Sequence, residues 1–114
     1  MGEFALTIPV LGGRSGALEE LARIVSASKR REYEESKRRL RIDREVWFLE
    51  TSMTGDTWMI FEEGKDIERS FSEWMASQEP FDVWLKEQMR EITGIEFSGT
   101  SPRVPRRLLR YPLK

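Results

Sequence analysis

Two neighbouring segments, REVWFLETS (residues 44–52) and DTWMIFEEG (residues 56–64), are apolar at consecutive positions. The turn sequence MTGD lies between them, so the sequence predicts a β-hairpin. Because successive side chains of a strand point to opposite faces, Trp47 and Phe48 face opposite sides of the sheet. A sheet built on this hairpin therefore needs apolar cover on both faces.

The rest of the chain alternates strand and helix patterns. We expect a strand over residues 4–11, a helical pattern over residues 15–40, a helix from Asp66 that ends at SQEP, a second helix from Pro80 to Thr93, and a short last strand at IEFSG, residues 95–99. A continuous helix over residues 15–40 would be about 39 Å long, whereas an eight-residue strand covers only about 26 Å. That helix must therefore bend or overhang the sheet.

The predicted order is β-α-β-β-α-β, which is typical of the ferredoxin-like α+β fold with a four-stranded antiparallel sheet and its helices on one side. With 114 residues the chain fits one domain. We assign residues 1–99 to this domain and residues 100–114 to a basic, proline-containing C-terminal arm. Since the helices of one chain cover only one sheet face, the second apolar face predicts a homodimer that packs sheet against sheet.

The C-terminal arm carries only basic charges. Arg103, Arg106, Arg107, Arg110 and Lys114 give it a charge of +5, although the net charge of the whole chain is −1. A basic tail is compatible with nucleic-acid binding, but the leucines of this arm favour docking instead. We expect the arm to pack on its own acidic body or on a partner subunit, and we do not expect nucleic acid as a partner.

The composition excludes several kinds of site. The chain has no Cys, no His and no Asn. It therefore lacks the side chains that usually bind zinc and haem and the groups of a Ser/His or Cys/His dyad, and we expect neither a metal nor a cofactor. The absence of Cys also fits a cytoplasmic protein. No segment reaches the roughly 20 apolar residues that span a bilayer, so we expect no membrane partner.

The stretch SQEPFDVWLKEQM, residues 77–89, places Asp82 just after Pro80. The simpler interpretation is that Pro80 restarts a helix, that Phe81 and Trp84 anchor it in the core, and that Asp82 stabilises the helix start. The functional alternative makes Asp82 a carboxylate at the mouth of a pocket, where it binds a ligand or acts as a base.

Four aromatic residues, Trp47, Trp58, Phe81 and Trp84, are candidates for the lining of an apolar ligand cavity, although side chains with this spacing also build cores and interfaces. Tyr33, Glu50 and Glu62 are the polar groups that we expect near them. Carboxylates can perform acid–base chemistry when their surroundings separate their pKa values. Glu50 and Asp82 are therefore the candidate catalytic residues, and Tyr33 and Glu62 join the four aromatic residues as candidate ligand contacts.

The segments REVWFLETSMTGDTWMIFEEG and DIERSFSEWMASQEPFDVWLKEQM, behind a first helix rich in Arg and Glu, resemble a family. They are similar to a domain-of-unknown-function group of small bacterial proteins in the dimeric α/β barrel (Dabb-like) superfamily. The likeness covers residues 5–97 and includes the pattern of Ser77, Pro80, Phe81, Asp82 and Trp84. It implies a homodimer whose two sheets pack face to face.

Members of that superfamily include cofactor-independent monooxygenases, haem-degrading enzymes, muconolactone isomerases and ligand-sensing domains, so the fold does not select a function. The absence of His and Asn separates this chain from several of the enzymes. We therefore expect a homodimeric small-molecule-binding or interaction module rather than an enzyme. The alternatives are a cofactor-independent monooxygenase or isomerase, and nucleic-acid binding through the arm.

Overall fold

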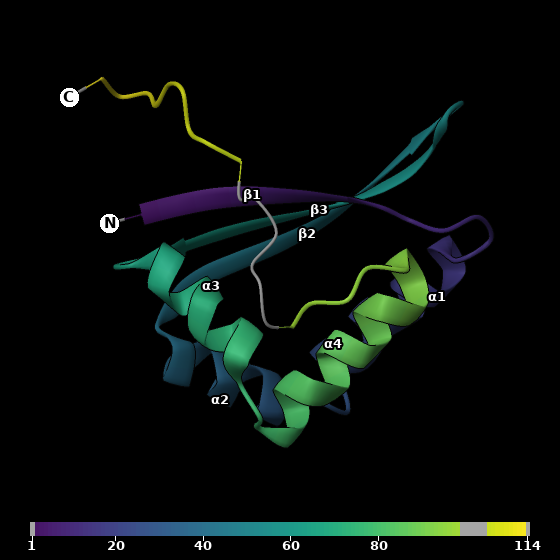
Figure 1. Ribbon diagram of the computed structural model, residues 1–114, viewed down its shortest axis with the longest axis horizontal. Coiled ribbons are helices and arrows are strands. Elements are labelled where there is room, and N and C mark those ends of the chain that lie inside the picture. The colour runs from purple at the N-terminus through teal and green to yellow at the C-terminus, as the bar shows by residue number, and fades with distance from the viewer. Residues whose placement is uncertain (1, 99–104, 114) are drawn as a thin grey trace.

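The computed structural model describes residues 2–98 and 105–113, and in these residues three antiparallel strands form a sheet with four helices on one face (Figure 1). The elements are β1 (Gly2–Pro9), α1 (Ser15–Ser26), α2 (Arg30–Leu40), β2 (Ile42–Ser52), β3 (Gly55–Gly64), α3 (Ile67–Ala76) and α4 (Pro80–Thr93). The predicted α+β class, the antiparallel sheet and the hairpin of β2 and β3 are confirmed.

β3 is the central strand of the sheet. It pairs antiparallel with β1 on one side and with β2 on the other, so β1 and β2 run parallel to each other. The chain crosses from β1 to β2 through α1 and α2, which is the split βαβ arrangement of ferredoxin-like folds. The register places Leu6 opposite Ile60 and Ile60 opposite Trp47, and it shifts between Ile42 and Arg44.

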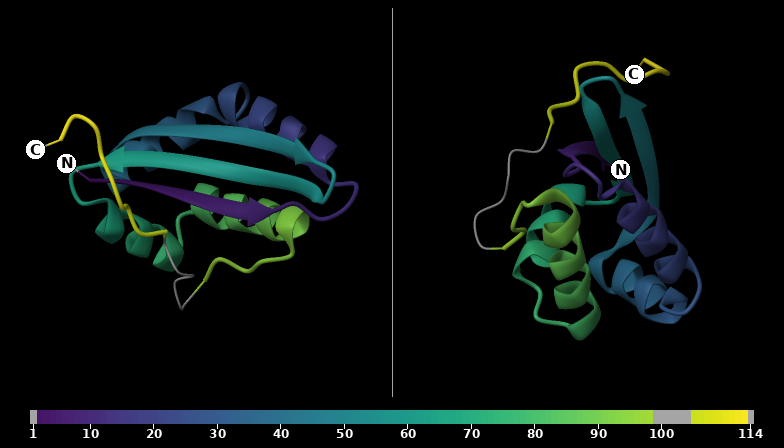
Figure 2. Two further views of the ribbon diagram at one scale, coloured as in Figure 1. Left: turned by 90° about the horizontal axis from the view of Figure 1, so that it is seen from above. Right: turned by 90° about the vertical axis from the view of Figure 1, so that its right-hand side faces the viewer.

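The core lies between the sheet and the helices (Figure 2). Alternate residues of β1, namely Phe4, Leu6 and Ile8, are buried, whereas Ala5 and Thr7 between them are exposed. Leucines and other apolar residues at helical spacing cover these strands: Leu18, Leu21, Val25, Leu40, Phe71, Trp74, Leu85, Met89 and Ile92. One sheet face is thus fully covered, and the other is left to solvent or to a partner.

The long helical pattern over residues 15–40 is bent, as its length requires. Turns at Ala27–Lys29 separate α1 from α2. The amide of Lys29 donates to the carbonyl of Ile24, and the last turn of α2 ends at Arg41, which has φ 61°. The bend lets both helices remain over the sheet.

α3 and α4 begin as the sequence predicts. Asp66 accepts a hydrogen bond from the amide of Arg69 at 3.3 Å and caps α3. Pro80 occupies the first turn of α4, where a missing amide costs nothing. Gly94 directly follows α4 and has φ 75°, a conformation that glycine adopts readily and that stops the helix.

The predicted fourth strand is not formed in the described part of its range. Residues 95–98 belong to no strand, and Gly99 lies outside the described residues. Phe97 is only 2% exposed, and its ring centroid lies 5.8 Å from that of Trp74. Burying a phenylalanine side chain stabilises by about 2 kcal/mol, so the segment stays against the helices and not beside β1.

Gly64 is the position in the sheet where a side chain would clash most directly. A Cβ built there would lie 2.7 Å from the carbonyl oxygen of Arg41, which is backbone and has little freedom to move. We expect Gly64→Ala to destabilise the protein by about 2 kcal/mol in urea unfolding. Gly12→Ala is the control, because no atom lies within 4 Å of its added Cβ. Equal midpoints for the two variants would contradict this account.

Candidate functional site

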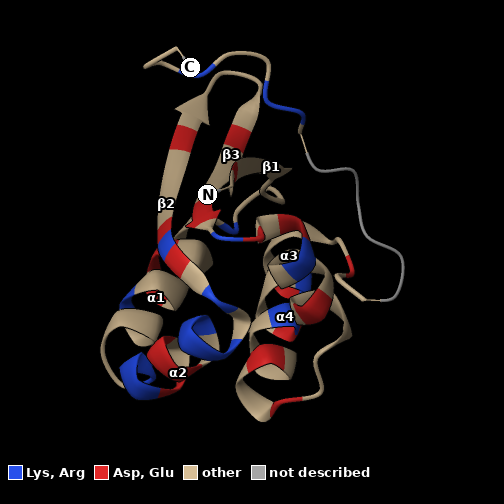
Figure 3. Cartoon of the chain, turned by 90° about the vertical axis from the view of Figure 1, so that its left-hand side faces the viewer, with Lys and Arg blue, Asp and Glu red and all other residues tan. Residues whose placement is uncertain are grey.

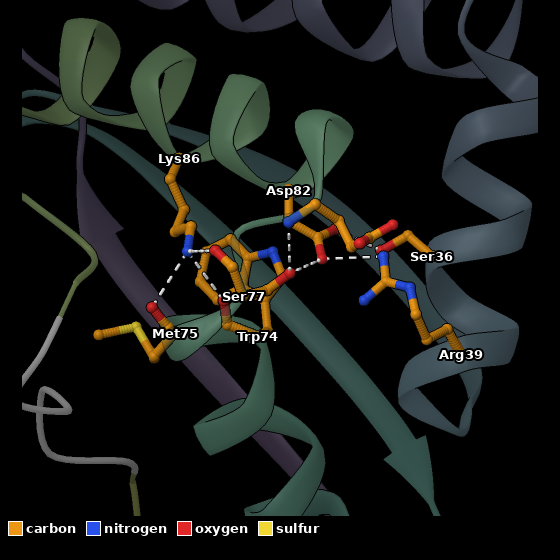
Figure 4. A network of polar contacts seen from close by, with 8 residues as sticks. Ser36, Arg39, Trp74, Met75, Ser77, Asp82 and Lys86 are labelled. Carbon is orange, nitrogen blue, oxygen red and sulfur yellow. Dashed lines mark hydrogen bonds and ion pairs between the residues drawn. The ribbon is translucent and has the colours of Figure 1, made fainter.

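Asp82 lies at the junction of α2, α3 and α4 and is completely buried (Figure 4). Ser36 donates to its Oδ1 at 2.6 Å, while Ser77 and Arg39 donate to its Oδ2 at 2.5 and 2.9 Å. Burial alone would raise the pKa of Asp82, but the hydrogen bonds from Ser36, Ser77 and Arg39 hold it below its usual value. The carboxylate is therefore ionised and fully occupied with holding three helices together.

Lys86 completes the junction from the next turn of α4. Its ammonium group donates to the carbonyl oxygens of Trp74, Met75 and Ser77 at 2.9–3.0 Å (Figure 4). These carbonyls end α3, where the helix dipole favours a positive charge. The stretch at residues 77–89 is thus a braced connection between two helices.

A second polar cluster lies on the helix-covered face of the sheet and joins α2 to β2 and β3. Glu45 and Glu62 are opposite each other in the β2–β3 register, so both carboxylates enter the core side by side. Tyr33 donates to Glu45 Oε1 at 2.7 Å, and Trp47 Nε1 donates to the same atom at 3.2 Å. Lys37 Nζ lies 2.9 Å from Glu45 Oε2 and 3.7 Å from Glu62 Oε2. We call Glu45 and Glu62 the carboxylate pair.

The two members of the carboxylate pair have different protonation behaviour. Burial, the hydrogen bond with Glu45 and the negative charge of Glu45 raise the pKa of Glu62 to about 9, although the nearby Lys37 acts to lower it. Burial opposes ionisation of Glu45 too, but the charge of Lys37 and hydrogen bonds from Glu62, Tyr33 and Lys37 keep its pKa below the usual value. At neutral pH the pair therefore holds one proton, on Glu62, and one charge that Lys37 balances.

A cavity of about 30 Å³ adjoins the carboxylate pair between the sheet and the helices. Glu45, Glu62, Lys37 and Trp47 line it, together with Trp74, whose buried Nε1 has no hydrogen-bond partner in residues 2–98 and 105–113. This volume accommodates one or two water molecules, whereas organic ligands occupy pockets of roughly 300 Å³ or more. The core beside the pair is thus almost filled.

The aromatic candidates form two groups of ring contacts, one on each side of Glu45. The tilted rings of Trp84 and Phe81 have centroids 5.7 Å apart. Phe81 and Tyr33, at 6.2 Å, and Trp47 and Trp58, at 4.9 Å, meet edge to face. Glu45 connects the two groups, because both Tyr33 and Trp47 donate to it. Of the six candidate ligand contacts, Trp47 and Glu62 line the cavity, and Tyr33, Phe81, Trp84 and Trp58 do not.

The two candidate catalytic residues lie away from this cavity. Glu50 is exposed and pairs with Thr57 near the hairpin turn, and Asp82 is enclosed among the helices. The sequence analysis missed Glu45 and Lys37, although a signal was present for each. Glu45 precedes Trp47 by two residues and shares its strand face, and Lys37 follows Tyr33 by one helical turn.

The sheet face opposite the helices is apolar in its centre. Two rows of cross-strand neighbours compose it: Ala5, Phe61 and Val46, then Thr7, Met59 and Phe48. Phe48 is 56% exposed. Glu3, Glu63 and Arg44 lie at one end of these rows and Glu50 at the other. We call this surface the open face.

No family model, curated protein or solved structure matches the chain. The resemblance to the dimeric α/β barrel superfamily therefore stays a prediction. Among the described residues, no helix is long and apolar enough to cross a bilayer, and no three metal-ligating side chains come together.

Removing the Asp82 carboxylate leaves the buried Ser36 hydroxyl and Arg39 without their partner. Since Arg39 remains 39% exposed, we expect Asp82→Ala to cost about 3 kcal/mol of unfolding free energy, the lower end for a broken buried pair. The lowered pKa adds a pH signature. The stabilisation by the Asp82 carboxylate is present above the unfolded Asp pKa of about 3.9 and is lost as the pH falls through the lower pKa of Asp82 in the folded protein. Urea unfolding with exposed Glu79→Ala as control tests this, and a loss below about 1 kcal/mol would contradict it.

The raised pKa of Glu62 predicts the opposite trend with pH. Between the unfolded Glu pKa of about 4.3 and the folded value of about 9, the folded state binds more protons, so wild-type stability falls as the pH rises. Glu62→Gln imitates the protonated form, and we expect its stability relative to wild type to rise by up to about 1.4 kcal/mol per pH unit in this range. Urea unfolding at pH 5, 7 and 9 measures the difference.

Glu63→Gln is the matched control for this experiment, because Glu63 is the adjacent residue of β3 and lies at the end of the open face. Its stability should follow the wild-type curve. Parallel curves for wild type and Glu62→Gln would show that Glu62 is ionised in the folded protein.

Proposed function

We propose that the chain is a homodimeric interaction module in which the open faces of two subunits pack against each other. The single observation that carries the proposal is the open face itself, an apolar surface on a sheet whose other face is already covered. Sheets that pack face to face lie about 10 Å apart and exclude water from such side chains. This assembly is that of the dimeric α/β barrel proteins that the sequence resembles.

The small cavity supports a module rather than a receptor for an organic ligand. About 30 Å³ beside the carboxylate pair is less than such a ligand needs. Two positive charges of the basic arm are already paired, because Arg107 and Arg110 both contact Glu3. This pairing weakens the case for nucleic-acid binding through the arm. The chain has no cysteine and therefore no disulfide, which fits the cytoplasm, the compartment that we expect.

The carboxylate pair supports a second candidate function, an acid–base site for a very small substrate. Glu62 is a protonated carboxyl group and Glu45 an ionised one, which is the division that acid–base catalysis uses. Trp74 Nε1 would add a hydrogen-bond donor on the cavity wall. Such a site must open to admit substrate, since the cavity holds only one or two waters at rest.

Native mass spectrometry tests both candidates in one spectrum. We expect the wild-type protein at twice the mass of one chain, without an attached small molecule. Phe48→Glu places a charge in the apolar interface twice, at about 2 kcal/mol or more each, so the dissociation constant should rise by about 10³. Ile95→Glu is the control, because Ile95 follows α4 and lies outside the open face.

A wild-type monomer would overturn the dimer proposal, and so would an unchanged dimer in Phe48→Glu. A reproducible small-molecule excess in the wild type that disappears on denaturation would favour the second candidate instead.

A further inference from the structure

The described part of the C-terminal arm, residues 105–113, is held to its own subunit by charge. Arg110 Nε lies 3.0 Å and Arg107 Nη1 3.6 Å from Glu3 Oε1. Glu3 alternates with buried Phe4 on β1, so its carboxylate lies on the open-face side of the strand. Figures 2 and 3 show the arm on this side of the sheet, with the helices on the other. The arm is thus attached at the Glu3 end of the open face.

The apolar side chains in the described part of the arm are largely exposed. Leu108 is 82% exposed, Leu109 77%, Tyr111 89% and Leu113 71%. Four such side chains in nine residues form an unusually apolar exposed segment. The ion pairs with Glu3 therefore position the arm, and its leucines remain available to another surface.

A groove of suitable character lies at the free edge of β2. It has a volume of about 100 Å³ and is lined by Leu18, Ala22, Trp47, Phe48, Leu49 and Trp58, with Glu19 of α1 beside them. The lining is almost entirely apolar, and Glu19 supplies one negative charge for a basic partner. We call it the edge groove. Its chemistry complements a segment in which leucines stand between arginines.

The edge groove of the same subunit lies well away from the point where Glu3 anchors the arm. Glu3 lies in register with Arg44 across β3, and Phe48 follows Arg44 by four residues along β2. Two strand spacings and four residues place Phe48 about 16 Å from Glu3. Leu108 and Leu109 stand between the two anchoring arginines, so the Cα atom of each lies only about 3.8 Å from the Cα atom of an anchoring arginine.

We propose that the arm of each subunit inserts Leu108 and Leu109 into the edge groove of a second copy of the chain. This inference rests on the proposed homodimer, because Phe48 belongs to both the open face and the edge groove. When the two open faces meet, the arm of one subunit crosses the rim of the other. Arg107 and Arg110 stay on Glu3 of their own subunit, and Arg106 faces Glu19 of the partner groove.

Engineered cysteines test the contact cleanly, because the chain has no cysteine of its own. Two full-length variants, Leu109→Cys with a mass tag and Ala22→Cys without one, are mixed, left to exchange subunits and mildly oxidised. We expect the tagged–untagged disulfide dimer to be the main cross-linked product on a non-reducing denaturing gel. Leu109→Cys mixed with Ala76→Cys is the control, because Ala76 is exposed at the end of α3, away from the groove.

The outcomes separate this inference from the dimer proposal. A dimer by native mass with no cross-link above the Ala76→Cys control overturns the arm contact and leaves the homodimer standing. A monomer overturns both. A chain that carries Ala22→Cys and Leu109→Cys together and closes its disulfide within one chain shows docking in the same subunit, which also overturns the contact.

A second variant measures the contribution of the leucines without cysteine chemistry. Leu108→Ser with Leu109→Ser keeps every charge of the arm, and we expect it to raise the dimer dissociation constant about 30-fold. An unchanged dissociation constant in this variant would also count against the arm contact.

Discussion

The structure depends on one strand, β3, and on the two different faces that it presents. Trp58, Ile60 and Glu62 point to the helices, and Met59 and Phe61 point away from them. Because β3 pairs with both neighbours, these faces extend across β1 and β2 and set the division of the molecule into a covered side and an open side. Four helices cover the apolar residues of the first side, and the same alternation leaves apolar side chains exposed on the open side.

The covered side of the sheet buries charged groups, and their desolvation costs free energy that a purely apolar core would not lose. Two carboxylates and an ammonium group lose water there, which is unfavourable unless each is paired and hydrogen-bonded. Protonation of Glu62 removes one charge, and Lys37 balances the other on Glu45. The cluster connects α2 to both β2 and β3, so it fixes where α2 lies on the sheet. The nearly filled cavity favours a positional role for this cluster over a chemical one.

Local sequence signals predicted the elements well, since each depends on nearby residues. The turn at MTGD, the restart at Pro80 and the end at Gly94 follow from turn and cap chemistry within a few residues. The fourth strand failed because burial of Phe97 against Trp74 is a tertiary contact that outweighs a short alternating pattern. The carboxylate pair required the register of β2 on β3, which places Glu45 and not Glu50 opposite Glu62. That register was not readable from the spacing of the acids alone.

The position of Phe97 also bears on the arm. By holding the segment after α4 against the helices, it leaves the outer edge of β1 without a paired strand among the described residues. The arm then meets the sheet through two arginines on Glu3 and not through a ladder of backbone hydrogen bonds. If the arm paired with β1 as a strand, half of its side chains would point toward the covered face of the sheet in its own subunit. Because ion pairs hold the arm, Leu108 and Leu109 stay exposed beside the uncovered open face. A single dimer can bury both the leucines and the open face.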